Sequence, residues 1–148
     1  VLRGTADGED GMIELTDIAY VRSGAADLDS AARFTVDVVG LGPVGDVDAD
    51  GTAATAEHPD VNADQRVAYL RADGRHHRLA LVEGGSGVLA SGFTARDEEA
   101  LALAGTELET RGVTAHRGDP AAARSRRVAG FLAFDDPFGN RIELVVGQ

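Results

Sequence analysis

Apolar and polar residues alternate with a period of two in several short stretches of this sequence, which is typical of β-strands with one buried face. In the first stretch, residues 13–21, the alternation places Leu15, Asp17, Ala19 and Val21 on one face and Ile18 and Tyr20 on the other. Similar composition predicts further strands over residues 67–71, 76–82, 88–94, 113–116, 128–134 and 141–146.

Two other stretches have a helical period and end at glycines. The first begins after Asp27, which suits an N-cap, and ends at Gly40; its apolar stripe is Leu28, Ala31, Thr35 and Val38. The second is capped by Thr94 or Asp97 and runs to residue 111, before Gly112; its buried stripe is Leu101, Ala104 and Leu108.

The order of these elements indicates a duplication. Strand, helix, glycine and several strands occur twice at a spacing of roughly sixty residues, which predicts two βαβββ modules over about residues 12–74 and 75–148. Residues 1–11 are expected to form a frayed leader, with the domain beginning at Met12. Residues 41–62 are expected to hold a short strand at most, and residues 117–127 a loop.

Composition limits the possible partners. The 148 residues suffice for one domain with a real core, and the absence of a long apolar run argues against a membrane span. A net charge of −11 disfavours nucleic acids and anionic membranes, which bind basic patches. Residues 1–11 have no apolar export segment, so we expect a cytoplasmic protein.

Residue usage excludes several kinds of chemistry. There is no cysteine, which removes disulfides, thiolate nucleophiles and cysteine-bound zinc. All fourteen basic residues are arginine, so no phosphate-binding Gly-Lys-Ser/Thr loop exists. No Gly-x-Ser-x-Gly elbow of the serine hydrolase type is present.

The segment 135–140, Asp-Asp-Pro-Phe-Gly-Asn, predicts a tight turn, because proline fixes φ and glycine supplies a positive φ. In the strand that follows, Ile142, Leu144 and Val146 share one face, and Arg141, Glu143 and Val145 share the other. A carboxylate in the middle of a strand needs a cation, a hydrogen bond or a metal. His77 is a candidate companion for Glu143, although pairing with an arginine explains that position as well.

The run 67–81, Val-Ala-Tyr-Leu-Arg-Ala-Asp-Gly-Arg-His-His-Arg-Leu-Ala-Leu, followed by 136–144, Asp-Pro-Phe-Gly-Asn-Arg-Ile-Glu-Leu, resembles the vicinal oxygen chelate superfamily. Within that superfamily the sequence is most similar to a domain of the type I extradiol catechol dioxygenases, over nearly all of residues 12–147. The resemblance implies an α+β fold in which two βαβββ modules form a cupped half-barrel mixed sheet with the helices outside and the site inside the cup.

The resemblance also implies a metal site. In the extradiol enzymes, two histidines and one carboxylate hold Fe(II), from the first strand of each module and the last strand of the second, leaving positions for a catechol and O₂. Carried over, these positions fall on Asp17, His77 and Glu143, which implies Fe(II) or another divalent metal. Aspartate in place of the first histidine is a departure that resembles the iron-free copy found in two-domain enzymes, so the chain is also compatible with no metal. A glyoxalase would need a further glutamate on the strand near residues 67–72, where none occurs.

The remaining candidates have structural alternatives. His76 and His116 are candidate catalytic acids or bases, although surface positions explain both. Aromatic residues that would line a site for a flat substrate, and that would equally suit a core, are Tyr20, Tyr69, Phe131 and Phe134. A basic segment formed by Arg124, Arg126 and Arg127 is expected to be solvated, with steering of an anionic ligand as its functional alternative.

Two functions therefore remain open. The first is an extradiol-type dioxygenase domain that cleaves catechol-like aromatic diols. The second is a metal-free domain, either the non-catalytic half of a dioxygenase or a binder of a small aromatic or drug-like molecule. In both cases we expect a homodimer, because lone domains of this superfamily usually pair.

Overall fold

The computed structural model describes residues 13–45, 56–57 and 66–148. The predicted leader and start at Met12 lie outside the described residues, as does most of the segment 46–65. The described strands are β1 (Leu15–Ala25), β2 (Gly42–Pro43), β3 (Ala56–Glu57), β4 (Arg66–Arg71), β5 (Leu79–Ala95), β6 (His116–Arg117), β7 (Gly130–Asp135) and β8 (Arg141–Val146). The helices are α1 (Leu28–Phe34), continued by a π-helical turn η1 (Thr35–Val39), α2 (Glu98–Thr110) and α3 (Pro120–Ser125).

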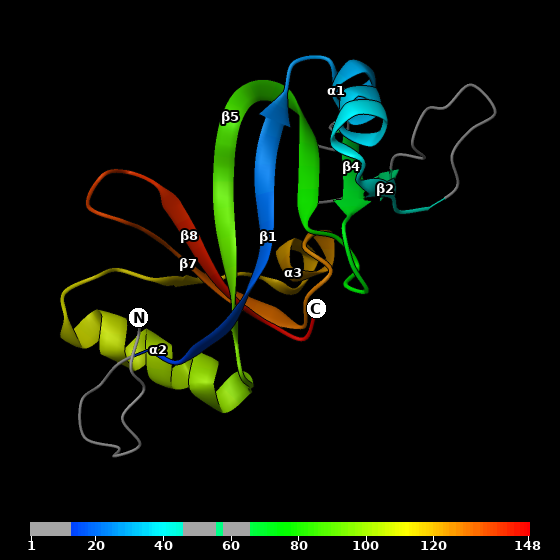
Figure 1. Cartoon of the computed structure of the whole chain (residues 1–148). Helices are drawn as coiled ribbons and strands as arrows, with labels where there is room; N and C mark the ends of the chain where they lie inside the picture. The colour runs from blue at the N-terminus through cyan, green and yellow to red at the C-terminus, as the bar shows by residue number, and fades with distance from the viewer. Residues whose placement is uncertain (1–12, 46–55, 58–65) are drawn as a thin grey trace, which may run out of the picture.

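The described strands form one mixed sheet (Figure 1). Its order is β2-β4-β5-β8-β7-β6, with β1 against β5 and β3 against β4. β5 and β8 are parallel, whereas β4 and β7 are antiparallel to their neighbours. The α+β half-barrel expected from the resemblance is therefore confirmed.

The long strand β5 bends around the end of β1 (Figure 1). Residues 15–25 of β1 lie opposite residues 95–84 of β5. Residues 21–25 also lie opposite residues 79–83, and here the residue numbers increase in the same direction along both segments. The bend uses Gly84, Gly85 and Gly87, which have φ values of 92°, 68° and 77° that only glycine adopts readily. Gly24 passes close inside the bend, because a Cβ there would lie 2.8 Å from the backbone nitrogen of Ser86.

The two longer helices pack on one face of the sheet. α1 begins after Asp27, whose carboxylate accepts from the Ser30 amide, and packs against Ala68, Leu70 and Leu81. α2 begins after Asp97 and packs its predicted stripe against Leu132, Leu144 and Val146. Both caps and both glycine ends at Gly40 and Gly112 agree with the prediction.

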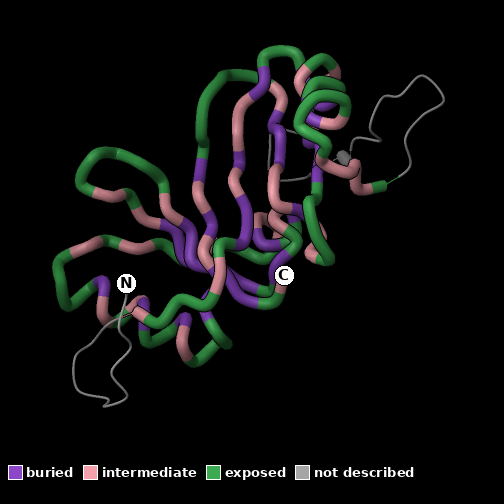
Figure 2. The backbone as a smooth tube through the Cα atoms, in the orientation of Figure 1, coloured by how far each residue is buried: buried purple, intermediate pink, exposed green. Residues whose placement is uncertain are grey.

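The opposite face of the sheet forms the inside of the cup. Val67, Tyr69, Ala80 and Val82 pack together on its first half. On its second half, Ala123 of α3 packs against Tyr20, Phe131 and Val145. The buried stretches in Figure 2 follow these central strands. None of the helices in the described ranges is long and apolar enough to cross a membrane.

The structure differs from the sequence-based prediction in several places. Val38 of the predicted apolar stripe is 68% exposed, and the strand predicted over residues 113–116 is replaced by the short β6. The two strands expected over residues 76–82 and 88–94 form the single bent strand β5, because both arms pair with β1. The expected loop 117–127 contains the helix α3, capped by Asp119. Ile18 is 58% exposed although Tyr20 is fully buried, because the register shifts between them.

Candidate functional site

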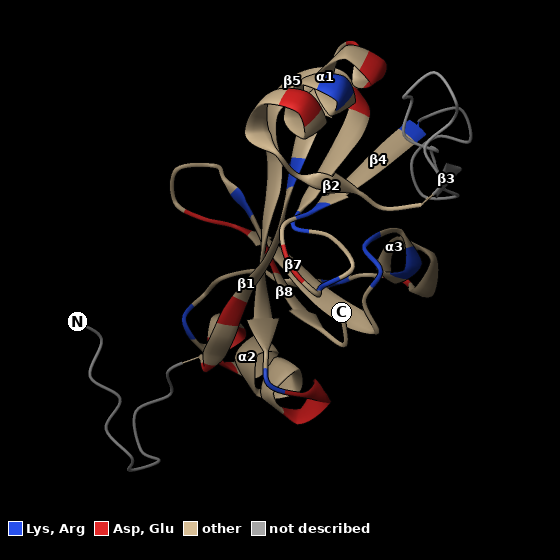
Figure 3. Ribbon diagram, turned by 45° about the vertical axis from the view of Figure 1, so that its right-hand side comes forward, with Lys and Arg blue, Asp and Glu red and all other residues tan. Residues whose placement is uncertain are grey.

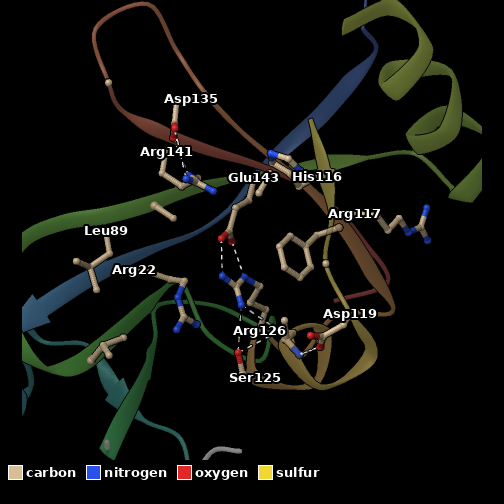
Figure 4. A pocket seen from close by; sticks show the side chains of 17 residues that line it. Arg22, Leu89, His116, Arg117, Asp119, Ser125, Arg126, Asp135, Arg141 and Glu143 are labelled. Atoms are coloured by element: carbon tan, nitrogen blue, oxygen red, sulfur yellow. Dashed lines mark hydrogen bonds and ion pairs between the residues drawn. The ribbon is translucent and has the colours of Figure 1, made fainter. Parts of the chain in front are cut away.

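A buried ion pair lies on the inside of the cup (Figure 4). Glu143, in the middle of β8, is 1% exposed. Arg126, directly after α3, approaches it with two nitrogens, at 2.8 Å from Nε to Oε2 and 2.7 Å from Nη2 to Oε1. The Tyr20 hydroxyl donates a third hydrogen bond of 2.6 Å to Oε2. Both oxygens of this carboxylate therefore have protein partners.

Local structure explains how these groups meet. The turn before β8 forms as predicted, since the Asp136 carboxylate accepts from the amides of Phe138 and Asn140 and Gly139 has φ of 85°. Strand alternation then points Ile142, Leu144 and Val146 towards α2 and leaves Glu143 for the cup. Arg126 is held by bonds from Nη1 to the Ala122 carbonyl and Ser125 Oγ, and its guanidinium lies 4.2 Å from the Phe131 ring centroid.

His77 lies between β4 and β5 and is completely buried. Its ring stacks on Tyr20, with centroids 5.2 Å apart and planes 18° apart, and meets Tyr69 edge-on at 4.8 Å. Its Nδ1 lies 2.9 Å from Nδ1 of the half-buried His76, and its Nε2 has no hydrogen-bond partner among the described residues. Burial, followed by repulsion from His76, lowers the pKa of His77 to about 3, so the ring is neutral at pH 7.

Tyr20 and Tyr69 form an aromatic cluster with His77, in which both have a structural role. Burial is the main reason that the pKa of Tyr20 is raised far above its usual value, and the Glu143 charge adds to it. The Tyr69 hydroxyl donates to the Ser125 carbonyl at 2.6 Å, and burial raises the pKa of this tyrosine as well. Neither ring lines the cavity described below, whereas the predicted Phe131 does.

Asp17 lies apart from this cluster. Its Oδ2 is 3.1 Å from Arg78 Nη2 and 3.5 Å from Arg75 Nη2, and its Oδ1 accepts from the Ile18 amide. The structure thus places Asp17 in an arginine network, His77 against aromatic rings and Glu143 in an ion pair. Within the described ranges, no group of three or more His, Cys, Asp or Glu side chains could hold a metal ion.

The donor set therefore does not fit the iron site of the family. The resemblance requires one ligand from the first strand of each module. The arm of β5 that pairs antiparallel with β1, residues 87–95, contains no His, Asp or Glu. His77 precedes the other arm of β5, and the carboxylate position is bound by Arg126 and Tyr20.

A cavity of about 790 Å³ opens beside the ion pair (Figure 4). Its charged lining residues are Arg22, Arg117, Arg126, Arg141, Asp119, Asp135 and Glu143, and its apolar ones include Val82, Leu89, Ala90 and Phe131. Arg141 pairs with Asp135 at 2.7 Å, and Arg117 pairs with Glu98. His116 also lines the cavity and is exposed on β6, whereas His76 does not line it.

Sequence reasoning missed two arginines of this site. Arg126 belongs to the segment expected to be solvated, yet only 17% of its side chain is exposed. Arg22 is 6% exposed, and its Nη1 is buried without a hydrogen-bond partner among the described residues. Burial, then repulsion from Arg126, lowers the pKa of Arg22. Arg22 lies two residues after Tyr20 on the same predicted strand, so strand alternation could have placed both side chains on one face.

The fold defines a domain of the vicinal oxygen chelate type. A family model described as the Glyoxalase/Bleomycin resistance protein/Dioxygenase superfamily matches residues 17–144. The chain belongs to this superfamily.

Similar proteins with curated names are extradiol dioxygenases. The 1,2-dihydroxynaphthalene dioxygenase of Sphingobium xenophagum is 28% identical over 137 residues, which are 92% of this chain and 41% of that protein. The biphenyl-2,3-diol 1,2-dioxygenase of Pseudomonas sp. strain KKS102 is 38% identical over 81 residues, 54% of this chain and 28% of that protein. A catechol 2,3-dioxygenase structure superposes with a TM-score of 0.74 at 25% identity, over 92% of this chain and 40% of that one. The chain thus spans less than half of these relatives.

Proposed function

We propose that this chain is a domain of an extradiol-type ring-cleaving dioxygenase for catechol-like aromatic diols, and that its own cup contains no iron centre. The curated relatives named above support the first part, since they are named for 1,2-dihydroxynaphthalene and biphenyl-2,3-diol. Ring cleavage in a protein that contains this domain would then use a metal bound outside the described residues.

The observation that best supports the second part is the bonding of Glu143. A carboxylate that ligates Fe(II) needs a free oxygen, whereas Arg126 and Tyr20 donate three hydrogen bonds to this one. The guanidinium is a permanent cation, so it neutralises the buried carboxylate as a metal would. In this domain Arg126 thus takes the structural place of a metal.

A second candidate function is metal-free binding of a small aromatic or drug-like molecule. The cavity of about 790 Å³ supports it, because apolar walls from Leu89, Ala90 and Phe131 lie beside several charged groups. Binding and membership of a dioxygenase are compatible, since a domain without iron still presents its cup to solvent.

An assay for ring cleavage tests the proposed function. Supplied anaerobically with excess Fe(II) and then with O₂, this chain is expected to leave catechol and biphenyl-2,3-diol intact. A natural protein that contains the chain is expected to cleave one of them and to keep its iron content when His77 is replaced by Gln. Cleavage by this chain alone, or iron lost from the folded His77→Gln protein, would contradict the proposal.

Several earlier predictions stay predictions. The divalent-metal site that the resemblance implies at Asp17, His77 and Glu143 is the alternative to a cup without iron, and the same assay on this chain tests it. His76→Gln and His116→Gln in that assay test the catalytic roles of His76 and His116. The homodimer is tested by light scattering, for which a mass near 30 kDa is expected from a 15.3 kDa chain. The cytoplasmic location is tested by cell fractionation.

A further inference from the structure

Arg22 is a buried cation without a counter-ion of its own. Its side chain extends from the middle of β1 into the cup, where it is 6% exposed and lines the cavity (Figure 4). Its Nη1 is fully buried and has no hydrogen-bond partner among the described residues. A buried guanidinium nitrogen without a partner is costly, because its N–H groups lose water and gain no hydrogen bond in return.

The neighbouring charges do not remove this imbalance. Glu143 is the nearby carboxylate that favours the charged form of Arg22, but both of its oxygens are already bonded to Arg126. Arg126 in turn repels Arg22. Two guanidinium groups therefore share one carboxylate at this side of the cup, which leaves one positive charge uncompensated.

The other arginines of the cavity are paired. Four arginines and three carboxylates line it, and Arg117, Arg126 and Arg141 form ion pairs with Glu98, Glu143 and Asp135, none of which includes Arg22. Figure 3 shows arginines near α3, whereas acidic residues mark the beginning of α2. A single negative charge would pair with Arg22, and the acidic residues of the lining and of the chain, whose net charge is −11, would oppose a dianion.

We propose that the cup binds an organic monocarboxylate, whose carboxylate pairs with the guanidinium of Arg22 and whose body lies against Val82, Leu89 and Ala90. A guanidinium presents paired N–H groups in a plane that matches the two oxygens of a carboxylate. The three apolar residues line the same cavity as Arg22, so one small molecule can reach both. Asp119, Asp135 and Glu143 in the lining disfavour phosphate, which is largely doubly charged at pH 7.

The carboxylate site at Arg22 rests on the proposed function only where the source of the ligand is concerned. In extradiol cleavage both atoms of O₂ enter the product and the ring C–C bond beside the diol breaks. The hydroxyl-bearing carbon at that bond becomes a carboxylic acid, which then releases its proton. The ring-opened product is therefore a carboxylate of the class that Arg22 would bind, and the cup would act as a product-sensing site in such an enzyme.

Calorimetric titration at pH 7 with three probes tests this site. Benzoate and the linear dienoate sorbate are expected to bind at one equivalent, and the neutral benzamide is expected to bind at least tenfold more weakly. Replacing Arg22 by Gln is expected to weaken benzoate binding by about tenfold or more, since a charge-assisted pair is lost. The matched control Arg33→Gln removes the same charge from the exposed end of α1 and is expected to leave binding unchanged.

A stability measurement separates recognition from a structural role. Without ligand, Arg22→Met is expected to keep or raise the thermal midpoint, because it removes an unpaired buried charge. Benzoate is expected to raise the midpoint of the parent but not that of Arg22→Met. The inference is overturned if the folded parent fails to bind benzoate and sorbate, if inorganic phosphate binds as tightly, or if Arg22→Gln binds benzoate unchanged. None of these outcomes bears on the iron content or ring-cleavage assays, so the two proposals fail separately.

Discussion

Arg126 and Glu143 form a two-point ion pair between the end of α3 and the middle of β8, with N–O distances of 2.8 and 2.7 Å. The pair lies where the family resemblance implied a metal ligand, and Tyr20 completes it from β1. Residues from β1, from the end of α3 and from β8 thus meet at one carboxylate. The inside of this cup is held together by protein donors.

Breaking the ion pair is expected to destabilise the fold strongly. Arg126→Met leaves the Glu143 carboxylate buried, with Tyr20 as its remaining side-chain donor among the described residues, which is expected to lower the free energy of unfolding by about 3 kcal/mol. The control Arg141→Met breaks an ion pair with Asp135 whose side chains are 44% and 54% exposed, so a loss below about 1 kcal/mol is expected. Urea unfolding at pH 7 measures the free energy of unfolding of both variants. Equal and small losses of this free energy would contradict a stabilising buried ion pair between Arg126 and Glu143.

The stability of the domain is expected to fall as the pH drops below about 6.5, because of His77. Its folded-state pKa is lowered to about 3 by burial, so between these pH values the unfolded chain binds a proton that the folded chain excludes. This contribution is complete above pH 6.5 and decreases by about 2 kcal/mol between pH 6.5 and 5. Urea unfolding at several pH values measures it.

The control for this prediction uses another histidine. His77→Gln removes the titrating group and is expected to flatten the pH dependence in this range, whereas replacing the exposed His116 by Gln is expected to leave it in place. A parent protein as stable at pH 5 as at pH 7 would show that His77 is accessible to protons in the folded state.

The contact between Gly92 and Tyr20 is expected to tolerate no side chain. A Cβ on Gly92 would lie 2.8 Å from Cε2 and 2.9 Å from Cζ of the buried tyrosine ring. Gly92→Ala is therefore expected to displace Tyr20 from Glu143 and to cost about 1–3 kcal/mol in urea unfolding. Gly74→Ala, where a Cβ meets nothing within 4 Å, serves as the control. Equal stability of the two variants would argue against tight packing around Tyr20.

The fold could be predicted from the sequence because its signals are local. Asp27 and Asp97 cap helices, the turn at Asp136 begins a strand, and alternation alone places Glu143 on the inner face. Bending of β5 around β1 could not be predicted, because it depends on pairing between distant residues.

The site was harder to predict than the fold. α3 is short and rich in alanine, without an amphipathic pattern, so the segment containing Arg126 resembled a solvated loop. The family pattern in turn favoured metal ligation at Glu143, because a strand sequence does not show which cation reaches a buried carboxylate. Only the packing of α3 into the cup shows that this cation is a guanidinium.

The most direct test of this account is an anaerobic Fe(II) titration of the chain by calorimetry at pH 7. The account predicts no saturable binding, because the Glu143 oxygens are bonded to Arg126 and Tyr20 and the described residues bring no three metal-binding side chains together. Saturable binding near one equivalent, lost in both His77→Ala and Glu143→Ala while the variants stay folded, would contradict it and establish a metal centre in this cup.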